Sequence, residues 1–286
     1  MAETYAQNYT LAELMAVAAA REINDGETVF IGIGVPLMAG LLAKSTHAPN
    51  MTLVYESGCV GPLQQRISYN VGDSACVDNA FYLTSQWRIF SDLQSGYIDV
   101  GILGGAQIDK YGNMNTTAIF GDGTYEEPVA RLPGSGGGND IGSSAKRVVY
   151  VMSLEKRRFF PRVDYITTLG YLSGGDAREK AGLCGGGPVS VITNKCIFRF
   201  EKDTKEMYLE SLHPHVTVDE VRNEIMWNLK VAPELKRTEP PTVQQVKIIR
   251  AIDPSGIILG VEAAISEIKD FVTWAEITER SIKKTR

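Results

Sequence analysis

The sequence is poor in the residues that build metal centres and disulfide frameworks. Its 286 residues include only four cysteines and three histidines. The cysteines, Cys59, Cys76, Cys184 and Cys196, are widely spaced and form no Cys-x-x-Cys pair. This spacing favours neither a zinc site nor a disulfide framework. We therefore expect a metal-free protein of the reducing cytoplasm, in which Cys59 and Cys184 pack rather than react.

An excess of basic charge and a long hydrophobic run are also missing. The formal net charge is −5, whereas nucleic-acid recognition needs a basic face. The longest apolar run near the N-terminus, Met15–Ala20, is far too short to span a bilayer, and the first residues lack the basic start of a signal peptide. The sequence therefore predicts a globular protein that binds neither nucleic acid nor membrane.

The chain alternates helix patterns with short buried strands. The first helix is predicted over 11–23, because Thr10 and Glu13 form a capping box before a run rich in Ala, Leu and Met. Later strands and helices follow from apolar runs and periodicity. The expected strands are 28–31, 51–55, 98–103, 114–120 and 148–152, and the expected helices are 37–43, 81–93, 218–227 and 243–252.

This alternation predicts an α/β protein with a mostly parallel open sheet flanked by helices. Near the C-terminus, 189–200 and 206–210 flank a polar turn and predict an antiparallel hairpin. Because there is no internal repeat or low-complexity linker, we expect one domain over 1–260. The final stretch, 261–286, has the pattern of an appended amphipathic helix.

The first glycine cluster, Gly32-x-Gly34, follows a predicted strand and opens a helix, as a dinucleotide-binding turn does. Leu37 occupies the third glycine position of that motif, where its side chain would obstruct close packing of helix on strand. A tight βα turn without NAD is therefore the better interpretation.

Glu56 ends a buried strand, and ligands of open α/β sheets bind at the carboxyl ends of strands. The following Ser57-Gly58 predicts a tight turn that pushes the carboxylate into such a crevice. The alternative is a helix N-cap or a surface carboxylate at a strand end, which the pattern alone slightly favours.

A glycine pair, Gly104 and Gly105, follows the strand at 98–103 and precedes Gln107. Glycines in this place let backbone N–H groups face an anion or an oxyanion. The polar residues behind them, Tyr111-Gly112-Asn113, are typical of a hairpin turn.

The segment 134–140 is dense in glycine and contains Gly136, Gly137 and Gly138. It lacks the Gly-Lys-Ser/Thr ending of a P-loop, which disfavours nucleotide triphosphate hydrolysis. Backbone contact with a pantetheine or pyrophosphate arm and a mobile loop are both open interpretations. For the compact basic cluster that follows it, Lys156-Arg157-Arg158, contact with a phosphate is one interpretation, but a solvated face or a subunit contact is the better one.

Together these segments resemble the class I CoA-transferases, and specifically the B subunit of the glutaconate-type enzymes. Each motif is weak by itself, but their common order is specific and favours a functional Glu56. The two-oxoacid branch of the family usually has Asn at the position of Ser57, so the glutaconate-type branch is the nearer comparison. The resemblance runs from the first helix to about Pro254 and depends on Gly32–Pro36, Glu56–Gly58, Gly104–Asp109 with Gly112-Asn113, Gly134–Gly138 and Glu155–Phe159.

The resemblance implies a CoA-transferase (NagB/RpiA-like) fold and covalent catalysis. The carboxylate of Glu56 would attack an acyl-CoA to give an acyl-glutamyl anhydride and then a glutamyl-CoA thioester. Gln107, Gly104 and Gly105, with the loop of Gly136, Gly137 and Gly138, would bind CoA or the oxyanion.

The same resemblance implies coenzyme A as the acyl-CoA substrate, no metal, and a homologous A subunit in an A2B2 or larger heteromer. Other reactions stay open on this fold: CoA-ester hydrolysis, decarboxylation, carbon–carbon cleavage, or CoA-ester binding without catalysis. The acyl groups are not disclosed, and Arg66, Arg88, Arg157 and Arg158 are equal candidates for a second carboxylate.

Overall fold

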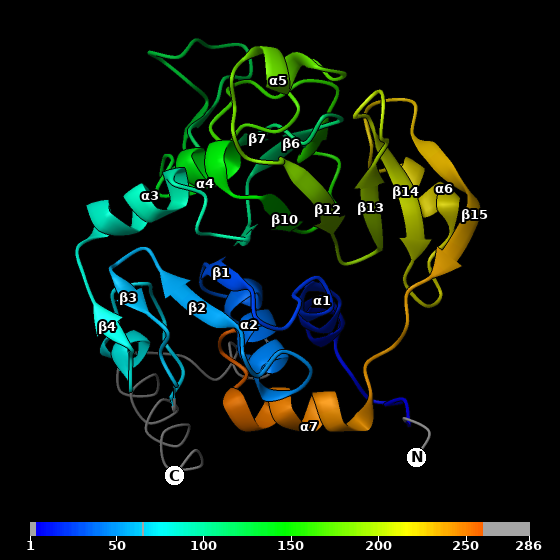
Figure 1. Ribbon diagram of the computed structural model, residues 1–286. Helices are drawn as coiled ribbons and strands as arrows, with labels where there is room; N and C mark the ends of the chain where they lie inside the picture. Colours follow the sequence, from blue (N-terminus) through cyan, green and yellow to red (C-terminus); the bar gives the residue numbers. More distant parts are fainter. Residues whose placement is uncertain (1–3, 65, 260–286) are drawn as a thin grey trace. The chain divides into compact units, whose positions relative to one another are not determined.

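The computed structural model describes residues 4–64 and 66–259, which belong to two compact units. Unit 1 combines Met1–Ile89 with Pro240–Arg286, and unit 2 is Phe90–Glu239. The chain therefore leaves unit 1 after its first strands, builds unit 2, and returns to complete unit 1 (Figure 1). The helix expected over 261–286 lies outside the described residues.

Unit 1 pairs its strands in the order β1-β2-β3-β4, parallel between β1 and β2 and antiparallel beyond. Helices α1, α2 and α7 pack on one another beside these strands (Figure 1). The elements of unit 1 are α1 (Leu11–Ala20), β1 (Thr28–Ile31), α2 (Val35–Ser45), β2 (Thr52–Tyr55), β3 (Cys59–Val60), the 3₁₀ helix η1 (Ser74–Val77), β4 (Tyr82–Leu83) and α7 (Val243–Ile252). Helix α3 (Gln86–Gln94) carries the chain into unit 2.

Unit 2 orders its main strands β15-β14-β13-β12-β10-β5. The pairs β5–β10, β10–β12 and β14–β15 are parallel, and β12–β13–β14 form antiparallel hairpins. Smaller sheets join β11-β6-β7 and β8-β9. The elements are β5 (Val100–Leu103), β6 (Gln107–Asp109), β7 (Met114–Asn115), β8 (Ala118–Ile119), β9 (Ala130–Arg131), α4 (Gly138–Ser144), β10 (Arg147–Val151), β11 (Phe159–Phe160), α5 (Ala177–Lys180), β12 (Pro188–Ile192), β13 (Cys196–Phe200), β14 (Met207–Leu212), α6 (Val218–Arg222) and β15 (Lys230–Arg237).

The predicted fold class is confirmed: parallel strand pairs, flanking helices and an antiparallel hairpin near the C-terminal part. Strands β1, β5 and β10 are apolar along most of their length and almost wholly buried. Continuous apolar strands of this kind are covered on both faces, which is how they differ from half-exposed strands. None of the helices within the described ranges is long and apolar enough to cross a membrane.

Helix α1 begins as predicted. Thr10 Oγ1 accepts from Glu13 N, and the Glu13 carboxylate accepts from Thr10 N, so the capping box is confirmed. The helix ends at Ala20, three residues before the expected end. Glu13 also pairs with Arg250 of α7, with 2.7 Å between Oε1 and Nε. The N-terminal helix and the last described helix of unit 1 are thus joined through one carboxylate.

The tight βα turn before α2 is confirmed. Gly34 is the N-cap of α2 and has a φ of +85°, a conformation that favours glycine. Leu37 is fully buried. The close approach of helix to strand occurs instead at Gly40, where an added Cβ would lie 2.2 Å from Ile31 Cδ1 and 3.0 Å from Leu53 Cδ2.

Two predicted boundaries in the first half of the chain are wrong because side chains or distant backbone groups interrupt the pattern. The strand expected over 114–120 is broken, since Asn115 Oδ1 accepts from the N–H groups of Thr117 and Ala118. The start of the helix expected over 81–93 is instead strand β4, paired with β3.

Two boundaries near the C-terminus are also wrong. The segment 189–200 is two strands, because Thr193 Oγ1 accepts from the N–H groups of Lys195 and Cys196 and turns the chain. The helix expected over 218–227 ends at Arg222.

Cys59 is buried as expected, and its Sγ donates to Cys76 O at 2.8 Å. The expectation for Cys184 is wrong, because it is exposed. Close packing occurs instead at the next two residues. A Cβ added to Gly185 would lie 2.5 Å from Ala145 O, and one added to Gly186 would lie 2.1 Å from Lys146 O.

Alkylation should separate these thiols. Only a thiolate reacts, and burial raises the pKa of Cys59 to about 11. We expect iodoacetamide at about pH 8 to modify Cys184 in the native protein and to leave Cys59 intact, as read by peptide mass spectrometry. Unfolding the protein first is the control that should make both cysteines reactive. Equal labelling of both in the native state would contradict the described packing of Cys59.

Candidate functional site

Glu56 lies in the turn that joins β2 to β3. Gly58 N donates to Tyr55 O at 3.1 Å and closes the turn, and Tyr55 pairs with Cys59 across the hairpin. Glu56 is half-buried, Ser57 is exposed, and the predicted tight turn at the strand end is confirmed. The carboxylate therefore sits at the carboxyl end of a buried parallel strand.

Backbone contacts with Thr84, the residue that follows β4, hold this turn. Gly58 has a φ of +111°, and a Cβ built on it would lie 1.8 Å from Thr84 O. Gly58 O in turn accepts from Thr84 N at 2.8 Å. Beneath the turn, Tyr55 is fully buried and its hydroxyl donates to Gln64 Oε1 at 2.6 Å. These contacts restrain the backbone of Glu56.

Within unit 2, the structure brings the two glycine-rich segments together. Gly105, which follows β5, and Gly136, which precedes α4, line one hollow of about 490 Å³. The remaining residues around it come from the β5–β6 and β7–β8 connections, the loop before α4 and the segment before β11. They are Ala106, Thr116, Leu132, Pro133, Gly134, Ser135 and Arg158.

The glycine pair after β5 lies in close packing, most tightly at Gly105. A Cβ on Gly105 would lie 2.1 Å from the Sδ of the buried Met114, and one on Gly104 would lie 3.2 Å from Val151 O. Gly105 lines the hollow, whereas Gly104 is exposed beside it in the chain. The chain passes close to these neighbours because neither residue carries a side chain.

The glycines before α4 serve different purposes. Gly136 has a φ of +48° with open space where a Cβ would be, so the backbone conformation is what favours glycine there. Gly137 is the N-cap of α4, and a Cβ on Gly138 would lie 2.7 Å from Thr168 Oγ1. Gly138 N already donates to Ser135 O at 2.9 Å.

Gln107 is not among the residues around the hollow. Its side chain is buried in β6, where Oε1 accepts from Asn115 Nδ2 at 2.6 Å and Nε2 donates to Asp164 Oδ2 at 3.3 Å. The amide is therefore held in one orientation by two partners.

A buried polar cluster behind β6 was missed by the sequence analysis, which predicted only a hairpin turn. The turn is present, but Asn113 Nδ2 also donates to both carboxylate oxygens of Asp109 and to Leu172 O. Asn113 Oδ1 accepts from the N–H groups of Gly170 and Leu172. Burial raises the pKa of Asp109 to about 6. The Asp-x-x-x-Asn spacing around a glycine was the available signal for this cluster.

The basic cluster divides between surface and hollow. Lys156 and Arg157 are exposed, as a solvated face requires. Arg158 instead lines the hollow, and its Nη1 donates to Gly105 O at 3.3 Å. The sequence alone did not separate these three neighbours.

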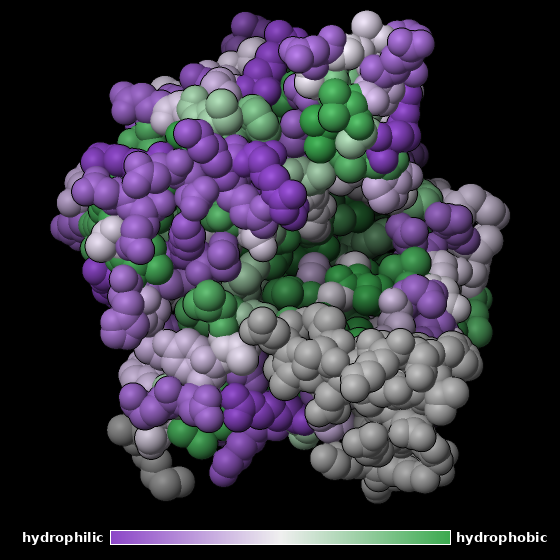
Figure 2. Space-filling model, turned by 180° about the vertical axis from the view of Figure 1, so that it is seen from behind, coloured by the Kyte–Doolittle hydropathy of each residue, from purple (hydrophilic) through white to green (hydrophobic). Residues whose placement is uncertain are grey.

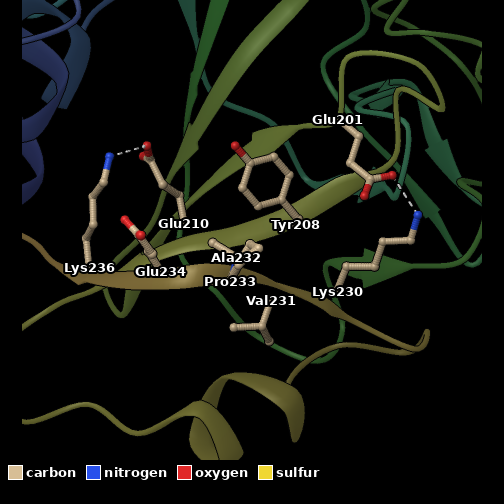
Figure 3. A pocket seen from close by; sticks show the side chains of 9 residues that line it. All are labelled: Glu201, Tyr208, Glu210, Lys230, Val231, Ala232, Pro233, Glu234 and Lys236. Atoms are coloured by element: carbon tan, nitrogen blue, oxygen red, sulfur yellow. Dashed lines mark hydrogen bonds and ion pairs between the residues drawn. The ribbon is translucent and has the colours of Figure 1, made fainter.

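A second hollow of about 470 Å³ lies where β15 bulges away from β14 (Figure 3). Four of its charged side chains form two ion pairs: Lys236 Nζ lies 3.4 Å from Glu210 Oε1, and Lys230 Nζ lies 2.6 Å from Glu201 Oε2 (Figure 3). No residue that the sequence singled out lines it. Within the described ranges there is also no cluster of three or more His, Cys, Asp or Glu that could hold a metal ion.

Comparison with known proteins gives consistent matches along the chain. The sequence profile of the coenzyme A transferase family matches residues 12–224. The B subunit of 3-oxoadipate CoA-transferase from Pseudomonas knackmussii is 40% identical over 246 residues, 86% of this chain and 94% of the relative. The B subunit of glutaconate CoA-transferase from Acidaminococcus fermentans is 34% identical over 261 residues, 89% of this chain and 96% of the relative. The crystal structure of glutaconate coenzyme A-transferase from A. fermentans matches with a TM-score of 0.83 and 33% identity, over 90% of this chain and 99% of that one.

Gly58→Ala should test how the turn is held. The positive φ alone costs about 1 kcal/mol for a non-glycine residue, and the contact with Thr84 O should bring the loss in unfolding free energy to roughly 3 kcal/mol or more. Gly26→Ala is the matched control, because Gly26 has a φ of +82° and no atom within 4 Å of an added Cβ. Chemical denaturation measures the unfolding free energy of both variants. Equal losses would mean that Thr84 does not hold the turn.

Proposed function

Because the chain belongs to the class I coenzyme A transferase family, we propose that Glu56 is the nucleophile of its CoA-transfer reaction. The observation that carries this proposal is the position of Glu56 on a rigid turn at the carboxyl end of β2. A nucleophilic carboxylate must approach the thioester carbon from a defined direction, and a turn held by Thr84 supplies that constraint.

The reaction balances with four nucleophilic steps and no other reactant. A carboxylate oxygen of Glu56 attacks the thioester carbon, and the C–S bond breaks to give an acyl-glutamyl anhydride and CoA thiolate. The thiolate attacks the glutamyl carbon and releases the first acid as its carboxylate. The second acid's carboxylate then attacks the glutamyl thioester, and the released thiolate attacks the acyl carbon of the new anhydride. Acyl-CoA leaves and Glu56 is regenerated as a carboxylate.

Each tetrahedral intermediate needs N–H donors, worth on the order of 3 kcal/mol apiece. We propose the loop of Gly136, Gly137 and Gly138, with Gln107, as their source, and Gly104 and Gly105 as CoA contacts. Because Gly138 N already donates to Ser135 O, Gly136 and Gly137 are the better donors of the loop. The donor of Gln107 would be its side-chain amide, which hydrogen bonds with Asn115 and Asp164 hold in place.

We also propose that the partner is a homologous A subunit, since both sequence relatives are B subunits by name. Unit 1 exposes large apolar side chains around β4, which we call the β4 patch. Exposed apolar groups that gather on a protein surface mark interaction sites. Figure 2 shows one face of the molecule, on which hydrophilic and hydrophobic side chains gather in separate areas. The β4 patch consists of Leu63, Val77, Phe81, Tyr82, Leu83 and Trp87.

The names of the relatives also indicate the acid. 3-Oxoadipate and glutaconate are both dicarboxylates. We propose a dicarboxylic acid as one of the two acids between which this chain's enzyme moves CoA.

Glu56→Gln should abolish the covalent intermediate. In the assembled A/B complex, brief exposure to acyl-CoA should leave a CoA-sized adduct on Glu56 of the wild-type chain, read by intact-protein and peptide mass spectrometry. The amide is a far weaker nucleophile, so the adduct should vanish and turnover should fall roughly 10³-fold or more. Ser57→Ala, next in the turn but exposed, should keep the adduct. Consumption of acyl-CoA by the wild type without any adduct would favour hydrolysis or carbon–carbon chemistry instead.

Leu83→Glu should weaken assembly with the A subunit. A carboxylate placed in a buried apolar contact costs several kcal/mol, so the dissociation constant should rise by roughly 100-fold or more. Isothermal titration or size-exclusion chromatography with the purified partner measures it. Val129→Glu is the control, because Val129 is also exposed but lies outside the β4 patch. Unchanged affinity of Leu83→Glu would place the interface elsewhere.

A further inference from the structure

The hollow of unit 2 has the size and lining of a site for one small anion with a carbon chain. Its volume of about 490 Å³ is in the range of small-molecule sites. Among the described residues around it, Arg158 carries the only charge, and Ala106, Leu132 and Pro133 supply apolar wall.

The backbone of Arg158 is fixed on both sides. Its N–H donates to Glu155 O at 2.8 Å, and its carbonyl accepts from Ile108 N at 2.7 Å. The next residue, Phe159, is fully buried, and its ring lies 5.9 Å from that of Phe198. The side chain of Arg158 therefore starts from a rigid point of the fold.

The guanidinium of Arg158 is positioned without being saturated. Nη1 donates to Gly105 O at 3.3 Å, and the buried Nε forms an ion pair with Glu155 Oε1 at 3.3 Å. A guanidinium carries five N–H donors in a planar fork that suits a carboxylate. The side chain is 29% exposed, so part of the fork can meet a ligand in the hollow.

Neighbouring charge does not cancel that of Arg158. Glu155 pairs with both arginines of the cluster, and its Oε2 lies 2.5 Å from Arg157 Nε while its Oε1 lies 3.3 Å from Arg158 Nε. Two guanidinium groups and one carboxylate leave a net positive charge. The hollow is accordingly suited to an anion.

The other arginines named as candidates for a second carboxylate are placed differently. Arg66 is bound at two points by Asp78, with Nε–Oδ2 of 3.0 Å and Nη2–Oδ1 of 3.1 Å. Arg88 is exposed on α3, and 77% of the Arg157 side chain is exposed. Only Arg158 of these four lines a described hollow.

We propose that Arg158 selects dicarboxylic substrates by binding their second carboxylate in this hollow, with the carbon chain along its apolar wall. One guanidinium in an otherwise uncharged lining matches a single carboxylate better than the several charges of the CoA phosphates. This inference rests on the proposed function, because it assigns a specificity residue to that reaction.

Kinetics of the A/B complex with matched acids test the role. We use acetyl-CoA as donor and compare glutarate with valerate, which has the same chain length and one carboxylate. Arg158→Gln keeps a hydrogen-bond donor for Gly105 O. It should lower kcat/KM for glutarate by about 10- to 100-fold, because that is the contribution expected of a hydrogen bond to a charged group. For valerate the change should stay within a few-fold. The kcat/KM of Arg158→Lys for glutarate should lie between those of the wild type and Arg158→Gln. Lys156→Gln removes one positive charge from an exposed neighbour and should change kcat/KM for neither acid.

Two outcomes would overturn the proposal. Unchanged selectivity in Arg158→Gln would remove any role in carboxylate recognition. An equal loss with both acids, together with a raised KM for acetyl-CoA, would assign Arg158 to a CoA phosphate.

Direct binding keeps this test separate from that of Glu56. Titration of the wild-type complex with glutarate alone should show binding that Arg158→Gln weakens about 10-fold or more, and Arg158→Gln should still form the CoA adduct on Glu56. If the wild type forms no adduct but binds glutarate through Arg158, the nucleophile proposal fails and the carboxylate site stands. If glutarate does not bind the wild type, the carboxylate site fails whatever happens at Glu56.

Discussion

The missing side chain of Gly58 is the constraint on which the placement of Glu56 depends. Its backbone lies so close to Thr84 that any Cβ would overlap the Thr84 carbonyl. This contact joins the β2–β3 turn to the residues between β4 and α3 by main chain alone, without a flexible side chain in between. Main-chain contacts of this kind tolerate little displacement, because interiors are close-packed and shift only at a cost. The main chain that carries the Glu56 carboxylate is therefore fixed before any ligand arrives, which favours its proposed role as a nucleophile.

The hollow of unit 2 is built on the same principle. Gly105 and Gly138 stand where side chains would overlap Met114 and Thr168, so segments distant in the sequence approach by their backbones. The Asp109–Asn113 cluster fixes the turn behind β6, and both polar atoms of the Asn113 side chain have partners. A fully satisfied buried polar cluster rigidifies its surroundings. Arg158 enters this frame from a backbone that is itself anchored.

Both candidate regions therefore combine a rigid main chain with one charged side chain. Glu56 supplies negative charge on a turn of unit 1, and Arg158 supplies positive charge at a hollow of unit 2. A carboxylate that attacks needs a defined direction, whereas a guanidinium that recognises an anion needs donors left over after its structural contacts. For the proposed nucleophile, the contact with Thr84 fixes the main chain of the turn. The proposed anion site depends on the second need, because the described contacts of the Arg158 side chain are one hydrogen bond, to Gly105 O, and one ion pair, with Glu155.

The sequence alone was enough for features that depend on neighbours in the chain. The capping box of Thr10 and Glu13, the strand ending at Glu56 and the hairpin near the C-terminus follow from residues a few positions apart, where local geometry and periodicity act. Features that depend on distant contacts were decided only by the tertiary structure. Pairing with β3 turned the start of a predicted helix into β4, and Gly185 and Gly186 took the packing expected of Cys184. Three adjacent basic residues, Lys156, Arg157 and Arg158, look equivalent in the sequence. Only the approach of Gly105 and the loop before α4 distinguishes Arg158 from the other two, because which side chain faces a hollow is settled by the segments that fold around it.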